Sequence, residues 1–397
     1  MSGILDGIRI IDAGTVLAAP GISALLGDFG AEVIKIEQPG VGDPLRTYSP
    51  RERDQGLVSK VTNRGKRSVS LDLGHPEGRE LFLGLVAQSD VVVMNYRMPT
   101  VQKWGIDYAD LQRVKNDIVM LHLTGYGRTG PYADRPGFAR VSEAFIGLTF
   151  ATGYPDRAPV PSGYAIADAM GGVFGAFAVI MALYERRSSG EGQLVDLSLY
   201  EGLAKTLDGM YIGALEGHGV PERSGTSNPT IAPHDIYPMG DGEWVSLPVS
   251  TQSMFVRLCG ILGVETLITD ERFATNQTRV KHRRALDEIL LPKFASMTAD
   301  EFLNKANAAG IAAVGINDAL AFANDPHVVE RGTFQKLWDP NLERDIQMQG
   351  VVPRFSRTPG EMTTPGEELG ASTDHVLSEL LKLEPEDLEK LRATRVI

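Results

Sequence analysis

The stretch Asp90-Val-Val-Val-Met94 predicts a central strand, because a nearly continuous apolar run of this length is typical of a strand buried on both faces of a parallel sheet. Ile118-Val-Met-Leu-His-Leu123 repeats the pattern. Before the first run, Pro76 to Gln88 has the amphipathic spacing of a helix. Strand and helix patterns that alternate in this way predict βαβ units, hence a largely parallel sheet with helices on both faces.

The alternation extends outward from these runs over residues 1–215. Further strands are predicted at 8–11, 32–37, 68–73 and 193–198, and further helices at 20–30, 168–187 and 199–214. The expected fold class is therefore α/β, with a large Rossmann-like domain.

The sequence pattern changes after residue 215. A stretch rich in Gly, Pro and Ser predicts a linker at 216–240, followed by a smaller α+β domain at 241–322 with helices at 252–262, 280–297 and 298–309. A second linker is predicted at 323–345. Residues 346–397, with a segment at 346–355 followed by two helices, are expected to return to the large domain.

The composition excludes several classes of protein. A chain of 397 residues exceeds one ordinary domain, and its net charge of −12 argues against nucleic-acid or anionic-membrane partners. The single cysteine, Cys259, cannot form an intrachain disulfide; it lies in an apolar run and is interpreted as core packing, with a reactive thiol as the alternative. The seven histidines have no ligand spacing, so no metal site is predicted.

The chain shows no targeting or membrane pattern in its sequence. Asp6 and Arg9 interrupt any apolar signal segment near the start, and no uncharged apolar run reaches the ~18 residues of a membrane span. We therefore predict a cytoplasmic protein without a membrane partner.

One glycine motif resembles a dinucleotide-binding fingerprint. Gly125-Tyr-Gly127-Arg-Thr-Gly130 satisfies G-x-G-x-x-G after a strand, but Pro131 and Pro136 follow it, and proline prevents the long helix that the fingerprint requires. We therefore do not predict NAD binding. The glycines instead indicate a tight loop over a ligand, or merely a turn.

Asp168 is the strongest candidate for chemistry. It is the single charged residue between Pro161 and Tyr184, and it stands between a loop and an apolar helix rich in small residues. Two interpretations fit this position. The carboxylate either caps the helix by accepting backbone N–H bonds or acts as an exposed nucleophile.

The order of these segments resembles the type III CoA-transferase family, the relatives of formyl-CoA and carnitine CoA-transferases. The resemblance rests on pieces that occur in the family's order over the first half of the chain: 5–12, 19–21, 26–40, 42–44, 63–73, 90–96, 125–132, 162–175 and 189–198. Beyond residue 215 the likeness is looser.

The resemblance implies that Asp168 is the nucleophile. Its carboxylate would attack an acyl-CoA thioester, and CoA would pass to a free carboxylic acid through aspartyl anhydride and thioester intermediates. Coenzyme A is thus implied as a substrate, with no tightly bound cofactor. The family also implies an interlaced homodimer.

The resemblance also implies which residues contact CoA, because they occupy the positions of the family's CoA contacts: Val16, Leu17, Gln38, Leu71, Asn95, Tyr96 and Lys103. Gly74 stands where the formyl-CoA enzyme has a lysine, so the CoA phosphates need other cations. The candidates are Lys66, Arg67, Arg97 and Arg128.

The acceptor is expected to be a dicarboxylic acid, with Arg140 as the hypothetical partner of its second carboxylate; a helix-surface charge is the alternative for Arg140. Three other functions stay open. The first is an α-methylacyl-CoA racemase-type isomerase, although no histidine base occurs between Ala133 and His218. The others are an acyl-CoA-binding subunit of a two-chain transferase and an NAD oxidoreductase.

Overall fold

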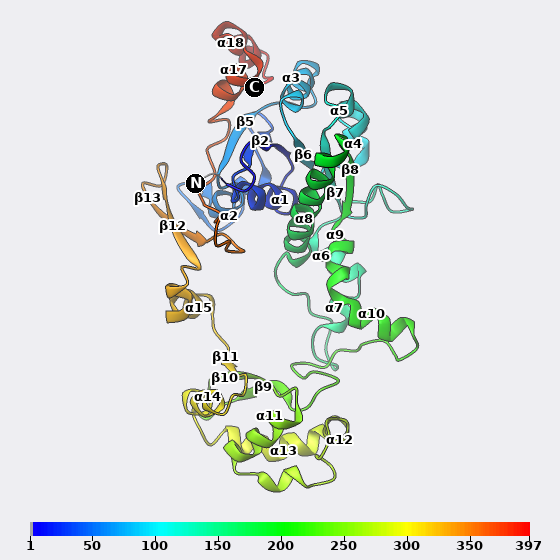
Figure 1. The fold of residues 1–397 in the computed structure, drawn as a ribbon, viewed down its shortest axis with the longest axis vertical. Helices are drawn as coiled ribbons and strands as arrows, with labels where there is room; N and C mark the ends of the chain where they lie inside the picture. The colour runs from blue at the N-terminus through cyan, green and yellow to red at the C-terminus, as the bar shows by residue number, and fades with distance from the viewer. Residues whose placement is uncertain (1–2) are drawn as a thin grey trace. The chain divides into compact units, whose positions relative to one another are not determined.

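A computed structural model describes residues 3–397, which divide into two compact units (Figure 1). The larger unit comprises residues 3–148, 161–219 and 327–397 of the described chain, and the smaller one 149–160 and 220–326. The smaller unit is thus an insertion in the larger one.

The larger unit is built on a six-stranded sheet in which every neighbouring pair is parallel. In spatial order the strands are β5 (Lys66–Ser70), β2 (Glu32–Glu37), β1 (Arg9–Ala13), β6 (Val91–Met94), β7 (Val119–Thr124) and β8 (Leu194–Ser198). The predicted α/β class with a parallel sheet is confirmed. The third predicted strand begins two residues earlier than expected, at Lys66, which pairs with Val33.

Helices cover both faces of this sheet because successive strand residues point to opposite sides. On one face, Ile11, Val92 and Met120 pack in one hydrophobic cluster. That cluster is completed by five helices: α3 (Pro76–Ala87), α4 (Met98–Trp104), α5 (Tyr108–Val114), α17 (Thr373–Leu381) and α18 (Pro385–Ala393). On the other face, Ile10 and Leu121 pack against α1 (Ala18–Gly27) and α8 (Ile166–Ser189).

The packing of α8 on α1 depends on a glycine. A Cβ atom at Gly175 would lie 2.3 Å from Cδ1 of Ile22, which is fully buried in α1. At least one of the small residues in the apolar helix that follows Asp168 therefore serves helix packing. The short helices α6 (Ala139–Phe145), α9 (Leu199–Ala204) and α10 (Asp208–Leu215) complete this side.

Helix α8 is long and apolar enough to cross a membrane by length and composition alone. A central helix of an α/β domain meets the same criteria, and α8 packs through Val179, Ala182 and Leu183 into the hydrophobic cluster with α1. Its opposite face carries exposed apolar side chains: Val173, Phe177, Ile180, Met181 and Tyr184.

The smaller unit is α+β. Strands β9 (His234–Pro238), β10 (Trp244–Pro248) and β11 (Val314–Gly315) form an antiparallel sheet with β10 in the centre. Its core also receives α11 (Gln252–Leu262), α13 (Arg283–Phe294) and α14 (Ala299–Ala308). Cys259 is fully buried in this core, which agrees with packing and not with a reactive thiol.

The observed elements differ from the expected linkers. The stretch 216–240 contains β9, whose hydrogen-bonded pairing with β10 makes it part of the smaller unit. The stretch 323–345 contains α16 (Pro326–Glu330) and β12 (Phe334–Asp339). Strand β12 forms a hairpin with β13 (Arg344–Gln349), and both belong to the larger unit. The helix expected at 280–297 is instead two helices, because α12 (Asn276–Lys281) ends before His282 and α13 begins after it.

Candidate active site

Asp168 lies in the first turn of α8, as the third residue of the helix. The residue before the helix is Ala165, which caps nothing through its side chain, so the N-cap interpretation of Asp168 was wrong. Within residues 3–397 the Asp168 carboxylate has neither a hydrogen bond nor an ion pair, so it is available to a ligand.

The environment of Asp168 makes its carboxyl group unusually basic. Burial, together with repulsion from the Glu143 carboxylate, raises the pKa of Asp168 to about 6. Glu143 lies on α6 and is 1% exposed; its Oε2 accepts a 2.9 Å hydrogen bond from Ser162 Oγ, and its Oε1 has no partner in the described part of the chain. A carboxylate with a raised pKa is still ionised at neutral pH and is a better nucleophile than an ordinary one.

Asp168 lines a cavity of about 240 Å³. The cavity lies where four neighbouring strands end: Thr15–Ala18 follow β1, Asn95 and Arg97 follow β6, Thr124 and Gly125 close β7, and Leu199 follows β8. Residues 133 and 135–138 form a further wall. The carboxyl ends of strands are the usual ligand site of open α/β sheets.

The loop after β1 is held in an unusual conformation. Val16 has a φ of 66°, in the left-handed region that a β-branched residue adopts only with strain on the order of 1–3 kcal/mol. Both carboxylate oxygens of Asp43 accept its N–H, at 3.0 and 3.1 Å. Thr15 is held by Asn95, whose Oδ1 accepts the Thr15 N–H at 2.8 Å and whose Nδ2 donates to the Thr15 carbonyl at 2.9 Å.

The residues with predicted CoA contacts fall into three groups. Val16, Leu17 and Asn95 line the cavity with Asp168. Leu71 is 1% exposed and belongs to the core, and Gln38 is exposed and lines none of the cavities described here. Their assigned contacts, like the other site assignments from the family, stay predictions.

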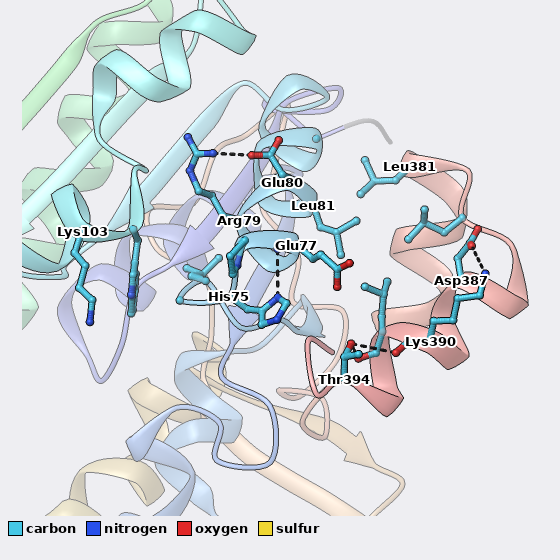
Figure 2. A pocket seen from close by; sticks show the side chains of 17 residues that line it. His75, Glu77, Arg79, Glu80, Leu81, Lys103, Leu381, Asp387, Lys390 and Thr394 are labelled. Carbon is cyan, nitrogen blue, oxygen red and sulfur yellow. Dashed lines mark hydrogen bonds and ion pairs between the residues drawn. The ribbon is translucent and has the colours of Figure 1, made fainter.

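Tyr96 and Lys103 belong to a second region. Lys103 lines a larger cavity of about 860 Å³ between α3, the end of α4 and the C-terminal helices α17 and α18. Figure 2 shows Lys103 on one side of this cavity and Asp387 and Lys390 of α18 on the other. The Tyr96 ring packs edge-on against Trp104, another lining residue, with 4.9 Å between ring centroids. Arg97, the N-cap residue of α4, lines the Asp168 cavity, and the other end of α4, at Lys103 and Trp104, lines the second cavity.

Three of the four cations proposed for the CoA phosphates are already paired. Lys66 is buried 2.7 Å from Asp12, Arg67 pairs with Glu32 and Glu379, and Arg128 pairs with Asp107 at 2.8 Å. Arg97 forms no ion pair within residues 3–397 and lines the cavity. It is therefore the candidate of the four that is free to bind an anion.

Arg135 is a cation at the cavity that sequence reasoning missed. It follows the glycine loop, and its guanidinium carbon lies 3.7 Å from the centre of the Tyr132 ring. Tyr132 belongs to an aromatic cluster with Tyr126, Phe145 and Tyr200. Sequence patterns did not reveal Arg135 because its position depends on how the loop packs. Both arginines are exposed, but Arg140, on α6, does not line the cavity.

The glycine loop itself is not a dinucleotide fingerprint. No helix follows it until α6 begins at Ala139, so the helix that would receive a pyrophosphate is missing. A Cβ at Gly125 would lie 2.6 Å from the Cα of Gly137, so the two glycines allow the ends of the loop to touch. This close contact explains the need for glycine there.

The comparisons with known proteins agree with one another. The sequence model described as CoA-transferase family III matches residues 5–373. The chain is 39% identical to succinyl-CoA–D-citramalate CoA-transferase of Chloroflexus aurantiacus, with 99% of this chain and 98% of that one covered. It is 38% identical to the beta subunit of succinyl-CoA–L-malate CoA-transferase of the same organism, with the same coverage.

A solved structure supports the same relationship. The crystal structure of a CAIB/BAIF family protein from Brucella suis superimposes with a TM-score of 0.85 at 31% identity, covering 96% of this chain and 100% of that one. The chain therefore belongs to CoA-transferase family III and is a CoA-transferase.

Proposed function

We propose that the protein transfers CoA from the CoA thioester of a dicarboxylic acid, such as succinyl-CoA, to a second dicarboxylic acid through covalent intermediates on Asp168. The observation that carries the proposal is an unpaired carboxylate with a pKa near 6 that lines a cavity at the strand ends. Relatives whose names specify succinyl-CoA with citramalate or malate support the class of substrate.

The reaction begins when an Asp168 oxygen attacks the thioester carbonyl. The C–S bond breaks, which leaves a mixed anhydride on Asp168 and a CoA thiolate. The thiolate then attacks Cγ of Asp168 and expels the donor acid as its carboxylate, which leaves an aspartyl–CoA thioester.

The second half runs in reverse with the acceptor acid. Its carboxylate attacks Cγ of Asp168 and releases the thiolate, which then attacks the acceptor carbonyl and restores the Asp168 carboxylate. No step consumes or releases a net proton, so no general base is required. An isomerase of the racemase type would need such a base, and no histidine lines the described cavity.

The two cavities provide a path for CoA. A cavity of about 240 Å³ is smaller than the ~300–1,000 Å³ of typical ligand pockets, so it fits an acyl group and the end of the pantetheine arm. We place the thioester there, beside Val16 and Leu17. The nucleotide would then lie along α4 toward Lys103 and Trp104 in the larger cavity, with Arg97 on the way.

Covalent labelling tests the proposal. Incubation with succinyl-CoA followed by borohydride will reduce the activated Asp168 carboxyl group, and mass spectrometry of the peptide that contains it will show the change. Asp168→Asn, which has the same shape, will bind succinyl-CoA without modification. An unmodified wild-type peptide, with binding shown separately, would favour the isomerase. Labelling that requires a second, different chain would instead favour the two-subunit transferase.

The pKa of Asp168 predicts the pH dependence of kcat/KM. Because only the ionised carboxylate attacks, kcat/KM will fall about tenfold per pH unit below pH ~6. In Glu143→Gln the repulsion is gone but burial remains, so the fall will begin at lower pH. Glu185→Gln, at the exposed end of α8, is the matched control and will not move the profile. An unchanged profile in Glu143→Gln would contradict the assigned cause.

We infer that Arg135 binds the distal carboxylate of the acceptor, a role that sequence reasoning gave to Arg140. Loss of a charge-assisted hydrogen bond, at about 1.5–3 kcal/mol, corresponds to roughly a 10- to 150-fold loss. Arg135→Ala will therefore reduce kcat/KM for succinate by that factor relative to butyrate as the acceptor. Measuring the same ratio in Arg140→Ala separates the hypotheses, since the arginine whose removal abolishes the preference for a dicarboxylate is the one that binds it.

We also propose that the enzyme is a homodimer, as the family resemblance implies. The exposed apolar residues of α8 recur at helical spacing on one face, and Phe177 and Tyr184 are 62% and 72% exposed. A contiguous apolar face of this kind is typical of a protein interface. We therefore assign it to contact with a second copy.

Sedimentation velocity tests the dimer. The wild type will sediment with twice the mass of one chain, and Phe177→Lys/Tyr184→Lys will shift the population toward single chains, because two lysines would be desolvated at the interface. Val114→Lys, which adds a charge at an exposed apolar site of α5, serves as the control. A wild type that sediments as a single chain at micromolar concentration would refute the assignment.

A further inference from the structure

The loop Gly14–Leu17 has a buried support that the transfer reaction does not use directly. Asp43, which holds the Val16 N–H, is 2% exposed and is the N-cap residue of the 3₁₀ turn that starts at Pro44. Its Oδ1 also accepts the Leu45 N–H at 2.9 Å. Lys35 Nζ, from β2, lies 3.0 Å from Asp43 Oδ2 and also donates to the Gly14 carbonyl.

A second buried pair supports the same loop from below. Asp12, the penultimate residue of β1, is fully buried, lies 2.7 Å from Lys66 Nζ and accepts the Gly14 N–H at 2.9 Å. Lys66 also donates to the carbonyl of Pro20 in α1 at 2.7 Å. The backbone groups of the loop and of the start of α1 are therefore held by side chains that water does not reach.

The supporting side chains affect the cavity through Val16, which is one of the lining residues. Valine strongly prefers negative φ, so its left-handed conformation persists only if other contacts impose it. The bifurcated hydrogen bond from its N–H to Asp43 is such a contact. If the Val16 peptide turned, the cavity wall formed by Thr15, Val16 and Leu17 would change.

We propose that Asp43 is a positioning residue: oriented by Lys35, its carboxylate keeps Val16 in the left-handed conformation and so sets the wall against which the thioester meets Asp168. This inference rests on the proposed function, because it takes the thioester as the ligand of that wall. Asp43 touches neither substrate nor nucleophile. Its effect is conveyed by the Val16 backbone.

The key experiment is a double-mutant cycle. In Asp43→Asn the side chain loses its charge and one acceptor oxygen, so kcat/KM for succinyl-CoA will fall about 10- to 100-fold, the loss that small misplacements of reacting groups cause. Glycine adopts positive φ without strain, so Val16→Gly will restore most of that loss in the double variant. The double variant is expected to lie within about threefold of Val16→Gly alone, because the conformation no longer needs Asp43.

A matched control separates positioning from stability. Asp28 is also buried and paired, with Arg64, but it lies at the opposite end of α1. Asp28→Asn will lower the melting temperature without a comparable loss in kcat/KM. Equal losses of kcat/KM in Asp28→Asn and Asp43→Asn, or losses that simply multiply in Asp43→Asn/Val16→Gly, would overturn the proposal.

A second comparison keeps the test decisive if Asp43→Asn does not fold. Proline fixes φ near −65° and has no N–H, so Val16→Pro forbids the observed conformation, which Val16→Gly allows. Val16→Pro is expected to lose at least about tenfold more kcat/KM than Val16→Gly. Equal activities in these two variants would refute the role of the left-handed conformation. Borohydride labelling of the wild type is measured in parallel, so a failure of Asp168 chemistry is distinguished from a failure of positioning.

Discussion

Two buried ion pairs hold the loop that lines the candidate active site. Lys35, inside β2, pairs with Asp43, and Lys66, at the start of β5, pairs with Asp12; all four side chains are almost fully buried. Burial alone would lower the pKa of Lys35, but the surrounding carboxylates of Asp12, Asp43 and Glu37 raise it, so the ammonium stays charged. Removing one partner from such a pair costs about 3–5 kcal/mol, because the other is left charged without water.

The side chains of these ion pairs form hydrogen bonds with backbone groups that lie outside regular secondary structure. Residues 14–16 of the loop from β1 to α1 lie outside regular secondary structure, and buried backbone groups need partners. Charged side chains supply them at Gly14 and Val16, and the amide of Asn95 does so at Thr15. A loop held in this way can keep a strained valine and a small cavity in place while substrates enter and leave.

Different parts of the surface of helix α8 have three different roles. Glycine at position 175 brings it close to Ile22 of α1, and its first turn carries Asp168 to the cavity. Its remaining face is apolar and exposed. A buried aspartate is costly to ionise, and this cost raises the pKa of Asp168. Glu143 strengthens the effect because it is buried nearby with an unpaired oxygen.

Sequence patterns were enough to predict the α/β architecture and to identify Asp168 as the candidate nucleophile. The apolar runs at 90–94 and 118–123 became the neighbouring central strands β6 and β7, since buried parallel strands have a local apolar signature. Asp168 was recognisable because it is the single charge in a long uncharged segment. Its helix position was misjudged, since helix ends depend on backbone contacts that sequence patterns locate poorly.

Which polar residues face the cavity depends on tertiary packing. Lys66, Arg67 and Arg128 were equal candidates with Arg97 until their carboxylate partners, from 21 to 312 positions away in the chain, were placed beside them. Arg135 and Glu143, which were not predicted, lie at the candidate site, whereas Arg140, which was predicted, does not. Loop packing and the orientation of α6 determine where each of these side chains lies. Electrostatic pairing across distant strands depends on three-dimensional proximity, which no local pattern encodes.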